Sequence, residues 1–441
     1  MTDPVERIRA AFRLNLEQQK KQAKDLLKAA KAGDASALTR FTAVMGDARD
    51  KPLGPGSLER DPISLKLADA QFVLARELQF SSWTELKSHI DSLDQARTAI
   101  EDKRHPPDAG SKTLHLRCGS DIRSTLVEAG FSGDFLEVSY PYCHGPVTSA
   151  PDHFEREARF IAGLAGKHMN VSYEDALTRR YEEERALAAS AASYERIVLW
   201  MEHDCFDQLV LVRCLAQYAS IETPPALELI GINHFPGRRA DGVPIRFIGL
   251  GQLPTEAIRL LWDRRRSVSP EQLVLGKDAW EALVLDDPRP LAAMMRTGTP
   301  ALPDLGRALH RFLQELPGIK DGLGVTERLI LQILSEASVS LNRLFSLMTY
   351  ERDPLFFATD LKLLEVVERM QNLTDPVLTR SAAGKQWEDV LSITDAGRAV
   401  LRGERDFLSL KPTPRWVGGV QIGPGHRDWR WDDAAQKPMS M

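Results

Sequence analysis

The sequence predicts an α/β protein: a mostly parallel, Rossmann-like sheet domain with an N-terminal helical module and a C-terminal winged-helix-like domain. Short apolar runs alternate with helical stretches over residues 112–316, which is the pattern of a parallel sheet with crossover helices. Residues 1–100 carry helical periodicity. Residues 325–404 combine three helical stretches with two β-like runs, and residues 405–441 form a tryptophan-rich tail.

The composition is that of an ordinary globular protein. The 441 residues are 43% hydrophobic and 27% charged, with a formal net charge of −5, so nothing general indicates nucleic-acid binding. No apolar stretch approaches the roughly 20 residues that span a bilayer. The N-terminus lacks basic and apolar leader regions, and we expect a cytoplasmic protein. The four cysteines, Cys118, Cys143, Cys205 and Cys214, lack paired metal-ligand spacing and are expected to be free thiols.

Helix signals dominate the first hundred residues. Asp3 can cap a helix that has Pro4 at its first position. Two further helices are predicted over residues 18–32 and 65–78, on either side of a loop at residues 51–56. We therefore expect an interaction or packing module here, with a protein partner as one function.

Another helix is predicted to begin after Ser82. Glu85 stands three residues later, where it completes a capping box. This region resembles the short helical segment found ahead of ankyrin repeats in bacterial proteins, although no ankyrin repeat follows. A charged, proline-containing linker at residues 101–111 closes the module.

The sheet domain is predicted from five apolar runs that read as strands. These runs cover residues 114–118, 135–138, 197–201, 227–232 and 244–248. If the strands are parallel, the loops after them meet at the carboxyl edge of the sheet, where ligands bind in open α/β folds. Those loops carry the candidate ligand-binding and catalytic residues, which are Gly119, Ser120, Asp121, His144, Glu202, His203, Asp204, Asp207, Gln208, His234, Gly249, Gly251 and Gln252.

The loop after the third run is the densest in ionisable groups, with Glu202, His203, Asp204, Asp207 and the amide of Gln208. Imidazole and carboxylates are the usual proton carriers and metal ligands at neutral pH, so the loop is a candidate acid/base or divalent-metal site. The alternative is structural, with Asp204 capping a helix and Asp207 complementing its dipole. The paired histidines of a zinc helix are absent.

Three other loops leave alternatives open. Amides near Gly119 and Ser120 could bind an anion, or Ser120 could cap the next helix; a nucleophilic Ser120 would need a histidine within hydrogen-bond reach. The glycines at 249 and 251 allow either close approach of a ligand or a tight turn. Cys143 is expected to be an inert thiol unless a neighbour lowers its pKa.

The rest of the chain is predicted to be helical up to a second change of pattern. Helices are expected over residues 254–266, 270–285, 288–295 and 302–316, with the basic run at 264–266 as a solvated helix end. Residues 325–404 then resemble a winged helix whose third helix spans residues 355–370. That region holds nine Lys or Arg against twelve Asp or Glu, which argues against DNA binding. The tryptophans of the tail are expected to pack onto the body.

Several motifs together resemble an uncharacterised bacterial family, domain of unknown function 1835 (DUF1835), with its usual C-terminal companion domain. The matching residues are 119–121, 133–134, 145–146, 199–204, 207–209, 247–253, 416–419 and 429–432. The family commonly has Gly-Asp-Ser after the first strand, where this chain has Gly119-Ser120-Asp121. The resemblance covers residue 114 to the C-terminus and implies no particular activity.

We expect an enzyme, a hydrolase or group transferase, that acts on a phosphorylated or nucleotide-like small molecule at the carboxyl edge of the sheet. His203 would be the general base, Asp204 and Asp207 would orient it or hold a divalent ion, and Ser120 with the Gly119 backbone would bind the anion. The alternatives are a ligand-sensing regulator or an interaction scaffold that uses the winged-helix-like domain or residues 1–100. Membranes and nucleic acids are not expected as partners, and no organic cofactor is indicated.

Overall fold

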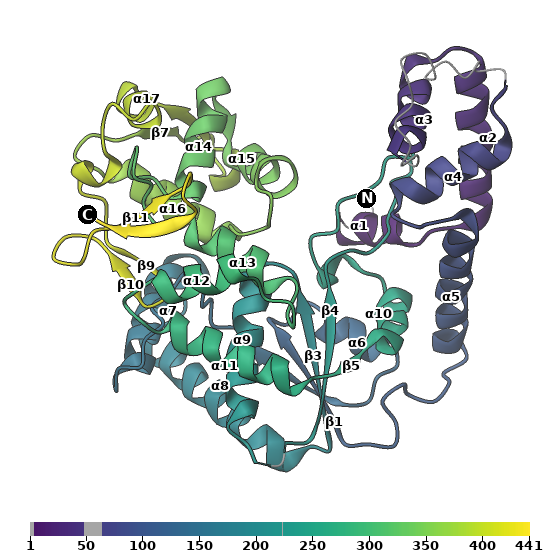
Figure 1. Ribbon diagram of the computed structural model, residues 1–441. Helices are drawn as coiled ribbons and strands as arrows, with labels where there is room; N and C mark the ends of the chain where they lie inside the picture. The colour runs from purple at the N-terminus through teal and green to yellow at the C-terminus, as the bar shows by residue number, and fades with distance from the viewer. Residues whose placement is uncertain (1–3, 48–63, 223) are drawn as a thin grey trace. The chain divides into compact units, whose positions relative to one another are not determined.

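The computed structural model describes residues 4–47, 64–222 and 224–441 (Figure 1). The cap predicted at Asp3 and the loop predicted at residues 51–56 lie outside these ranges. The chain forms two compact units, each built from separate stretches. The first unit comprises Met1–Gly110, Asp121–Ser132 and Ile232–Arg265, and the second comprises Ser111–Ser120, Gly133–Gly231 and Arg266–Met441.

The first unit is helical in its described residues. Its helices are α1 (Pro4–Phe12), α2 (Leu16–Lys31), α3 (Ala35–Asp47), α4 (Leu67–Glu77), α5 (Trp83–Glu101), α6 (Arg123–Glu128), α10 (Thr255–Leu261) and the 3₁₀ turns η2 (Leu250–Gln252) and η3 (Trp262–Arg264). The Ser82 side chain caps α5 by accepting the Glu85 N–H at 3.2 Å. The Glu85 carboxylate returns the bond to the Ser81 N–H at 2.9 Å, so the predicted cap is confirmed with its second bond displaced by one residue.

The second unit contains a five-stranded, mostly parallel sheet. Its strands are β1 (Thr113–Cys118), β2 (Asp134–Val138), β3 (Arg196–Glu202), β4 (Ala226–Ile232) and β5 (Arg266–Ser267), in the order β2-β1-β3-β4-β5. β1 is parallel to both β2 and β3, whereas β5 is antiparallel to β4. The first four predicted strands are confirmed.

The fifth predicted strand, at residues 244–248, is wrong. Within the described ranges, the one β-pairing of this segment is an isolated bridge from Pro244 to Arg238. The Ile245 N–H donates locally to the Gly237 carbonyl at 3.0 Å. A parallel strand needs a crossover of a dozen or more residues, and residues 233–243 are too few for one. The edge position is taken instead by β5, which begins at Arg266, the last residue of the helix predicted over residues 254–266.

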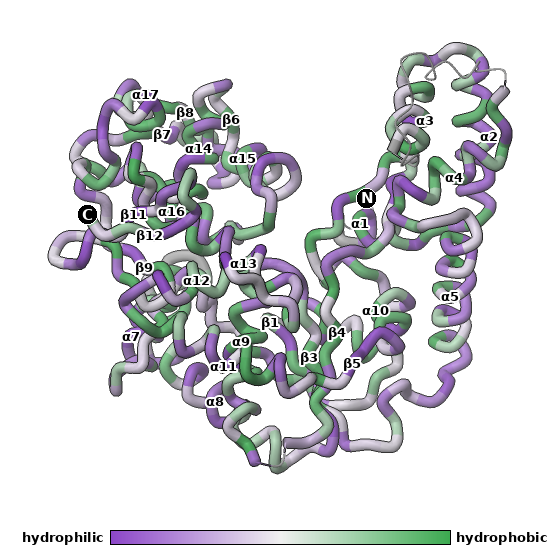
Figure 2. The backbone as a smooth tube through the Cα atoms, in the orientation of Figure 1, coloured by the Kyte–Doolittle hydropathy of each residue, from purple (hydrophilic) through white to green (hydrophobic). Residues whose placement is uncertain are grey.

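Helices pack on the sheet, and their apolar side chains form one hydrophobic core with it in the second unit. They are α7 (His153–Met169), α8 (Tyr173–Ser193), α9 (Cys205–Ala219), α11 (Pro270–Leu283), α12 (Arg289–Thr297) and α13 (Leu305–Leu313). Leu116 of β1 and Leu199 of β3 are fully buried in this core. α9 packs against α11, and most of its residues are buried and hydrophobic (Figure 2). The start of α9 is thereby fixed against the end of β3.

After residue 324 the chain alternates helices with a small antiparallel sheet. The elements are α14 (Val325–Glu336), β6 (Val339–Ser340), α15 (Leu341–Leu347), the π-helical turn η4 (Met348–Arg352), α16 (Asp360–Gln371), β7 (Leu378–Ser381), β8 (Val390–Ile393) and α17 (Asp395–Leu401), with strand order β6-β8-β7. The third helix begins at Asp360, so the start predicted at residue 355 is wrong. Leu355 and Phe357 are instead buried in the core beside the sheet, and Thr359 caps α16.

The tail forms two short hairpins that pack on the second unit. They consist of β9 (Arg415–Val417) with β10 (Val420–Ile422), and β11 (Trp429–Asp432) with β12 (Lys437–Ser440). Trp429 and Trp431 are buried, and the Trp431 N–H binds the Pro317 carbonyl at 2.7 Å. A Cβ at Gly419 would lie 2.2 Å from the Leu285 carbonyl oxygen, so only glycine fits there. In the described residues, no helix combines the length and hydrophobicity needed to cross a bilayer.

Candidate functional site

The candidate site begins with two neighbouring strands that end side by side. Arg117 of β1 lies opposite Trp200 of β3, so Arg117 and Glu202 are both close to the carboxyl ends of their strands. β2 and β3 flank β1 on opposite sides, which makes the β1–β3 boundary the point where the strand order reverses. Ligands bind at such reversal points in open α/β sheets.

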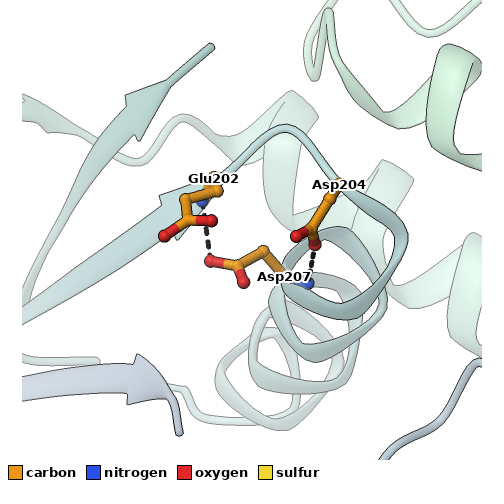
Figure 3. A group of neighbouring side chains, drawn as sticks. All are labelled: Glu202, Asp204 and Asp207. Atoms are coloured by element: carbon orange, nitrogen blue, oxygen red, sulfur yellow. Dashed lines mark hydrogen bonds between the residues drawn. The ribbon is translucent and has the colours of Figure 1, made fainter. Parts of the chain in front are cut away.

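Three carboxyl groups converge at this edge (Figure 3). Glu202 ends β3, Asp204 lies in the turn, and Asp207 is in the first turn of α9; one oxygen of each lies within 4.8 Å of the others. The Asp207 carboxylate accepts the Glu202 N–H at 2.7 Å, and the Asp204 carboxylate accepts the Asp207 N–H at 2.9 Å. Arg117 donates to both Glu202 and Asp207. We call these four residues the acidic cluster.

The acidic cluster is almost closed to solvent. The three acids and Arg117 are each 3–4% exposed. Burial, and then the neighbouring Asp207 carboxylate, raise the pKa of Asp204 to about 8, because a charged carboxyl in a dry site beside another negative charge is unfavourable. Asp204 is therefore largely protonated at neutral pH, while the single positive charge of Arg117 is shared between Glu202 and Asp207.

Two kinds of chemistry are available to such a cluster. A carboxylic acid with a pKa near the working pH can donate and accept a proton. A set of buried carboxylate oxygens can also hold a hard divalent cation such as Mg²⁺ or Mn²⁺. Three ionised carboxylates, one guanidinium and one divalent cation would form an electrically neutral set, so the donor types and the charges fit a cation.

All five predicted residues of this loop, Glu202, His203, Asp204, Asp207 and Gln208, are buried at the turn between β3 and α9. Asp204 is the N-cap of α9, which the structural alternative predicted. It is also one of the three acids whose carboxyl groups converge. The Gln208 side-chain amide donates to the Glu202 carbonyl at 2.5 Å and closes the turn. His203, which lies between Glu202 and Asp204 in the sequence, is also buried, with 7% of its surface exposed.

The loop after β1 differs from its prediction. Gly119 has a φ of +81°, a conformation that suits glycine, and Ser120 is exposed. α6 has only six residues and Ile122 as its N-cap, so the proposal that Ser120 caps this helix is wrong. No hydrogen bond joins Ser120 to His144 or His203 in the described residues, and a nucleophilic Ser120 remains only a prediction.

The loop after β2 is buried. His144 packs edge-on against the rings of Phe206 and Phe357, with centroids 4.8 Å from each. Burial lowers the pKa of His144 well below its usual value, with a further contribution from the Lys362 charge. Burial likewise raises the pKa of the Cys143 thiol well above its usual value, which agrees with an inert cysteine.

The remaining predicted residues belong to the first unit. His234 directs Nε2 toward the Leu78 carbonyl at 3.4 Å. The Gln252 side-chain oxygen accepts the Ile248 N–H at 2.7 Å and tightens the turn. A Cβ at Gly251 would lie 2.9 Å from Asp121 Oδ2, so this glycine allows the approach of a side chain of the protein itself. Residues 249–252 therefore form a tight turn, which was one of the two alternatives for these glycines.

Arg117 is the site residue that the sequence did not reveal. It lies in the run Leu114-His115-Leu116-Arg117-Cys118, where alternation put His115 and Arg117 on one face of a strand. A cationic side chain near the end of a buried strand indicates a nearby acidic partner, because buried charges are normally paired. Its partners became visible only with the β1–β3 register.

Comparison with known proteins adds no assignment to this geometry. No family model matches the chain, and no curated protein matches it.

Proposed function

We propose that this protein is an enzyme, a hydrolase or group transferase, that acts on a phosphorylated or nucleotide-like small molecule at the acidic cluster with a bound divalent cation. The observation that carries the proposal is the convergence of three buried carboxyl groups, with one oxygen of each within 4.8 Å of the others. A cation held there would attract a substrate phosphate that the cluster alone would repel.

The residues have distinct proposed roles. Glu202, Asp204 and Asp207 would supply oxygen ligands, and Arg117 would hold Glu202 and Asp207 in place. Binding of the cation would favour the ionised form of Asp204, whose pKa is raised to about 8 without it. His203, on the same turn, would take a proton from the attacking group.

Calorimetry with Mn²⁺ and Mg²⁺ tests the cation directly. Titration in two buffers with different heats of ionisation should show release of about one proton per cation near pH 7, because Asp204 must ionise to bind. Asp207→Asn should weaken binding at least tenfold, since it removes one of three charged ligands. Asp278→Asn, an exposed acid on α11, is the matched control and should bind normally.

Turnover is then measured with a panel of phosphate esters and nucleotides. Hydrolysis or transfer should require the cation and should fall at least a hundredfold in Asp204→Asn and His203→Ala. A protein that binds no divalent cation and turns over no member of the panel would refute the proposal.

A ligand-sensing regulator is the second candidate, because the order of α14 to α17 and the β6-β8-β7 sheet support a winged-helix-like domain. A DNA-binding regulator is disfavoured by the surface of α16, the helix that would enter the DNA groove in a winged-helix domain. Lys362 and Arg369 are both buried in the protein, where they pair with Glu365 and Glu327. Duplex binding at low salt that weakens steeply with added salt would reverse this judgement.

A further inference from the structure

A separate pocket of about 410 Å³ lies in the second unit, lined by α7, α16 and β9. This volume is within the range of roughly 300–1,000 Å³ that small-molecule sites occupy. Four cationic side chains line it, Arg156, Arg159, Lys362 and Arg415, against a single carboxylate, Glu365. We call it the basic pocket.

The one carboxylate of the basic pocket is already engaged. Glu365 binds Lys362 at 2.8 Å and lies 3.7 Å from Arg369. Burial would raise the pKa of Glu365, but Arg369 and Lys362 outweigh it and lower that pKa to about 2. Glu365 therefore stays ionised at every ordinary pH and is still surrounded by an excess of positive charge.

Two acids outside the basic pocket pair with cationic residues of its lining. Asp152 accepts from Arg156 at 2.9 Å, and Glu327 lies 3.5 Å from Arg415. Neither acid lines the basic pocket. The exposed Arg159 has no carboxylate within ion-pair distance in the described residues, which leaves its guanidinium available to a ligand.

His144 supplies an independent indication of a ligand. It lines the basic pocket and is 2% exposed, and neither ring nitrogen has a hydrogen-bond partner within ordinary geometry in the described structure. A contact with the Phe357 backbone only partly offsets the effect of burial on its pKa. Buried polar groups normally have partners, so the ring is suited to a hydrogen bond from a bound molecule or an ordered water.

We propose that the basic pocket binds the phosphate monoester of a small organic molecule. The phosphoryl group would contact Arg159, Lys362 and Arg415, since guanidinium and ammonium groups suit phosphate oxygens. The organic part would lie on Phe160 and Trp416, the aromatic side chains of the lining. This site goes beyond the activity proposed for the acidic cluster and does not depend on it.

Calorimetry on the full chain, with phenyl phosphate and inorganic phosphate as probes, tests the basic pocket. Wild type should bind both, and phenyl phosphate more tightly. Arg159→Glu should weaken both about ten- to hundredfold, the size expected for loss of a charged hydrogen bond. Arg185→Glu, the same charge reversal at an exposed position of α8 outside the pocket, should bind like wild type. Equal weakening by the two variants, or no binding by wild type, overturns the proposal.

A second pair of variants separates the parts of the site. Trp416→Ala should lose the preference for phenyl phosphate while it keeps the affinity for inorganic phosphate; an unchanged preference overturns the assigned orientation. Asp204→Asn should bind both probes normally, because the acidic cluster is a different site. Loss of probe binding in Asp204→Asn with retention in Arg159→Glu would place the phosphate at the acidic cluster and refute the basic pocket.

Discussion

The Asp204 carboxylate accepts the backbone N–H of Asp207 at 2.9 Å, so the side chain whose pKa is raised to about 8 is also the N-cap of α9. The cap bond favours the ionised form of Asp204, but the effect of burial on its pKa is larger. A protonated acid keeps a carbonyl oxygen that can accept the bond, so the fold can hold this carboxyl protonated. The same side chain thus has a structural and a chemical role, which substitution can separate.

Asp204→Asn and Asp204→Ala should differ in stability. Asparagine keeps a cap oxygen and removes the cost of a buried charge, so its free energy of unfolding at pH 7 should equal or exceed that of wild type. Alanine loses the cap and should cost about 1 kcal/mol. Urea unfolding monitored by circular dichroism measures both. Equal destabilisation by the two variants would show that the cap bond is unimportant.

Stability should fall with pH through the Asp204 titration. The folded-state pKa of about 8 lies above the model value of 3.8, so between these values the folded protein holds a proton that the unfolded chain has released. The stabilisation is complete below pH 3.8 and is lost as the pH rises toward 8, at up to about 1.4 kcal/mol per pH unit. The difference in free energy of unfolding between wild type and Asp204→Asn, measured at several pH values, isolates this dependence. A difference that does not change with pH would contradict it.

His89 should produce the opposite slope. It is buried in the first unit beside Phe80 and Phe235, and burial, with the Arg264 charge, lowers the pKa of His89 from 6.5 to about 4. The unfolded chain binds a proton first, so stability is lost as the pH falls from 6.5 to 4. His89→Phe keeps the ring packing and should lose less stability over that interval. Parallel curves for the variant and wild type would exclude His89 as the cause.

Arg117→Met should be strongly destabilising. The substitution leaves Glu202 and Asp207 buried without their cation, a change that costs about 3–5 kcal/mol at comparable sites. Added Mn²⁺ should restore part of the lost thermal stability, because a bound cation replaces the missing positive charge. Rescue by Mn²⁺ in this variant, compared with wild type, is measured by differential scanning calorimetry. Destabilisation without any rescue would count against a cation at the acidic cluster.

Gly419→Ala should destabilise the second unit. The new Cβ would lie 2.2 Å from the Leu285 carbonyl oxygen, and overpacking of this kind costs about 1–3 kcal/mol. Gly163→Ala, in the α7 helix, has nothing within 4 Å of the new Cβ and should stabilise by up to about 1 kcal/mol. The pair is compared by thermal unfolding, and a neutral Gly419→Ala would mean that the tail hairpin shifts easily.

The sequence predicted the four long strands because each is an apolar run of sufficient length. It missed β5, since Arg266-Ser267 has no hydrophobic pattern and is a strand only through its pairing with β4. Residues 244–248 were mistaken for a strand because apolar content was read without the length of the connection. Local pattern therefore predicted the centre of the sheet and failed at its edge.

For the candidate site, the sequence located the crowded turn after β3 but could not arrange it. Asp204 and Asp207 were visible because carboxylates are rare directly after a buried strand. Arg117 required the register between β1 and β3, whose paired residues are 83 positions apart in the sequence, such as Thr113 with Arg196. No local rule supplies that register. The burial that raises the pKa of Asp204 is likewise a property of the packed protein.

The contact between His144 and Phe206 has a thermodynamic consequence. Phe206 stands between Asp204 and Asp207 in the first turn of α9, and its ring packs on an imidazole that lines the basic pocket. A ligand that repositions His144 acts on the same turn that carries the carboxylates. The two ligands would then be linked, and any factor by which a phosphate ester changes the affinity for a cation must equal the factor by which the cation changes the affinity for the ester.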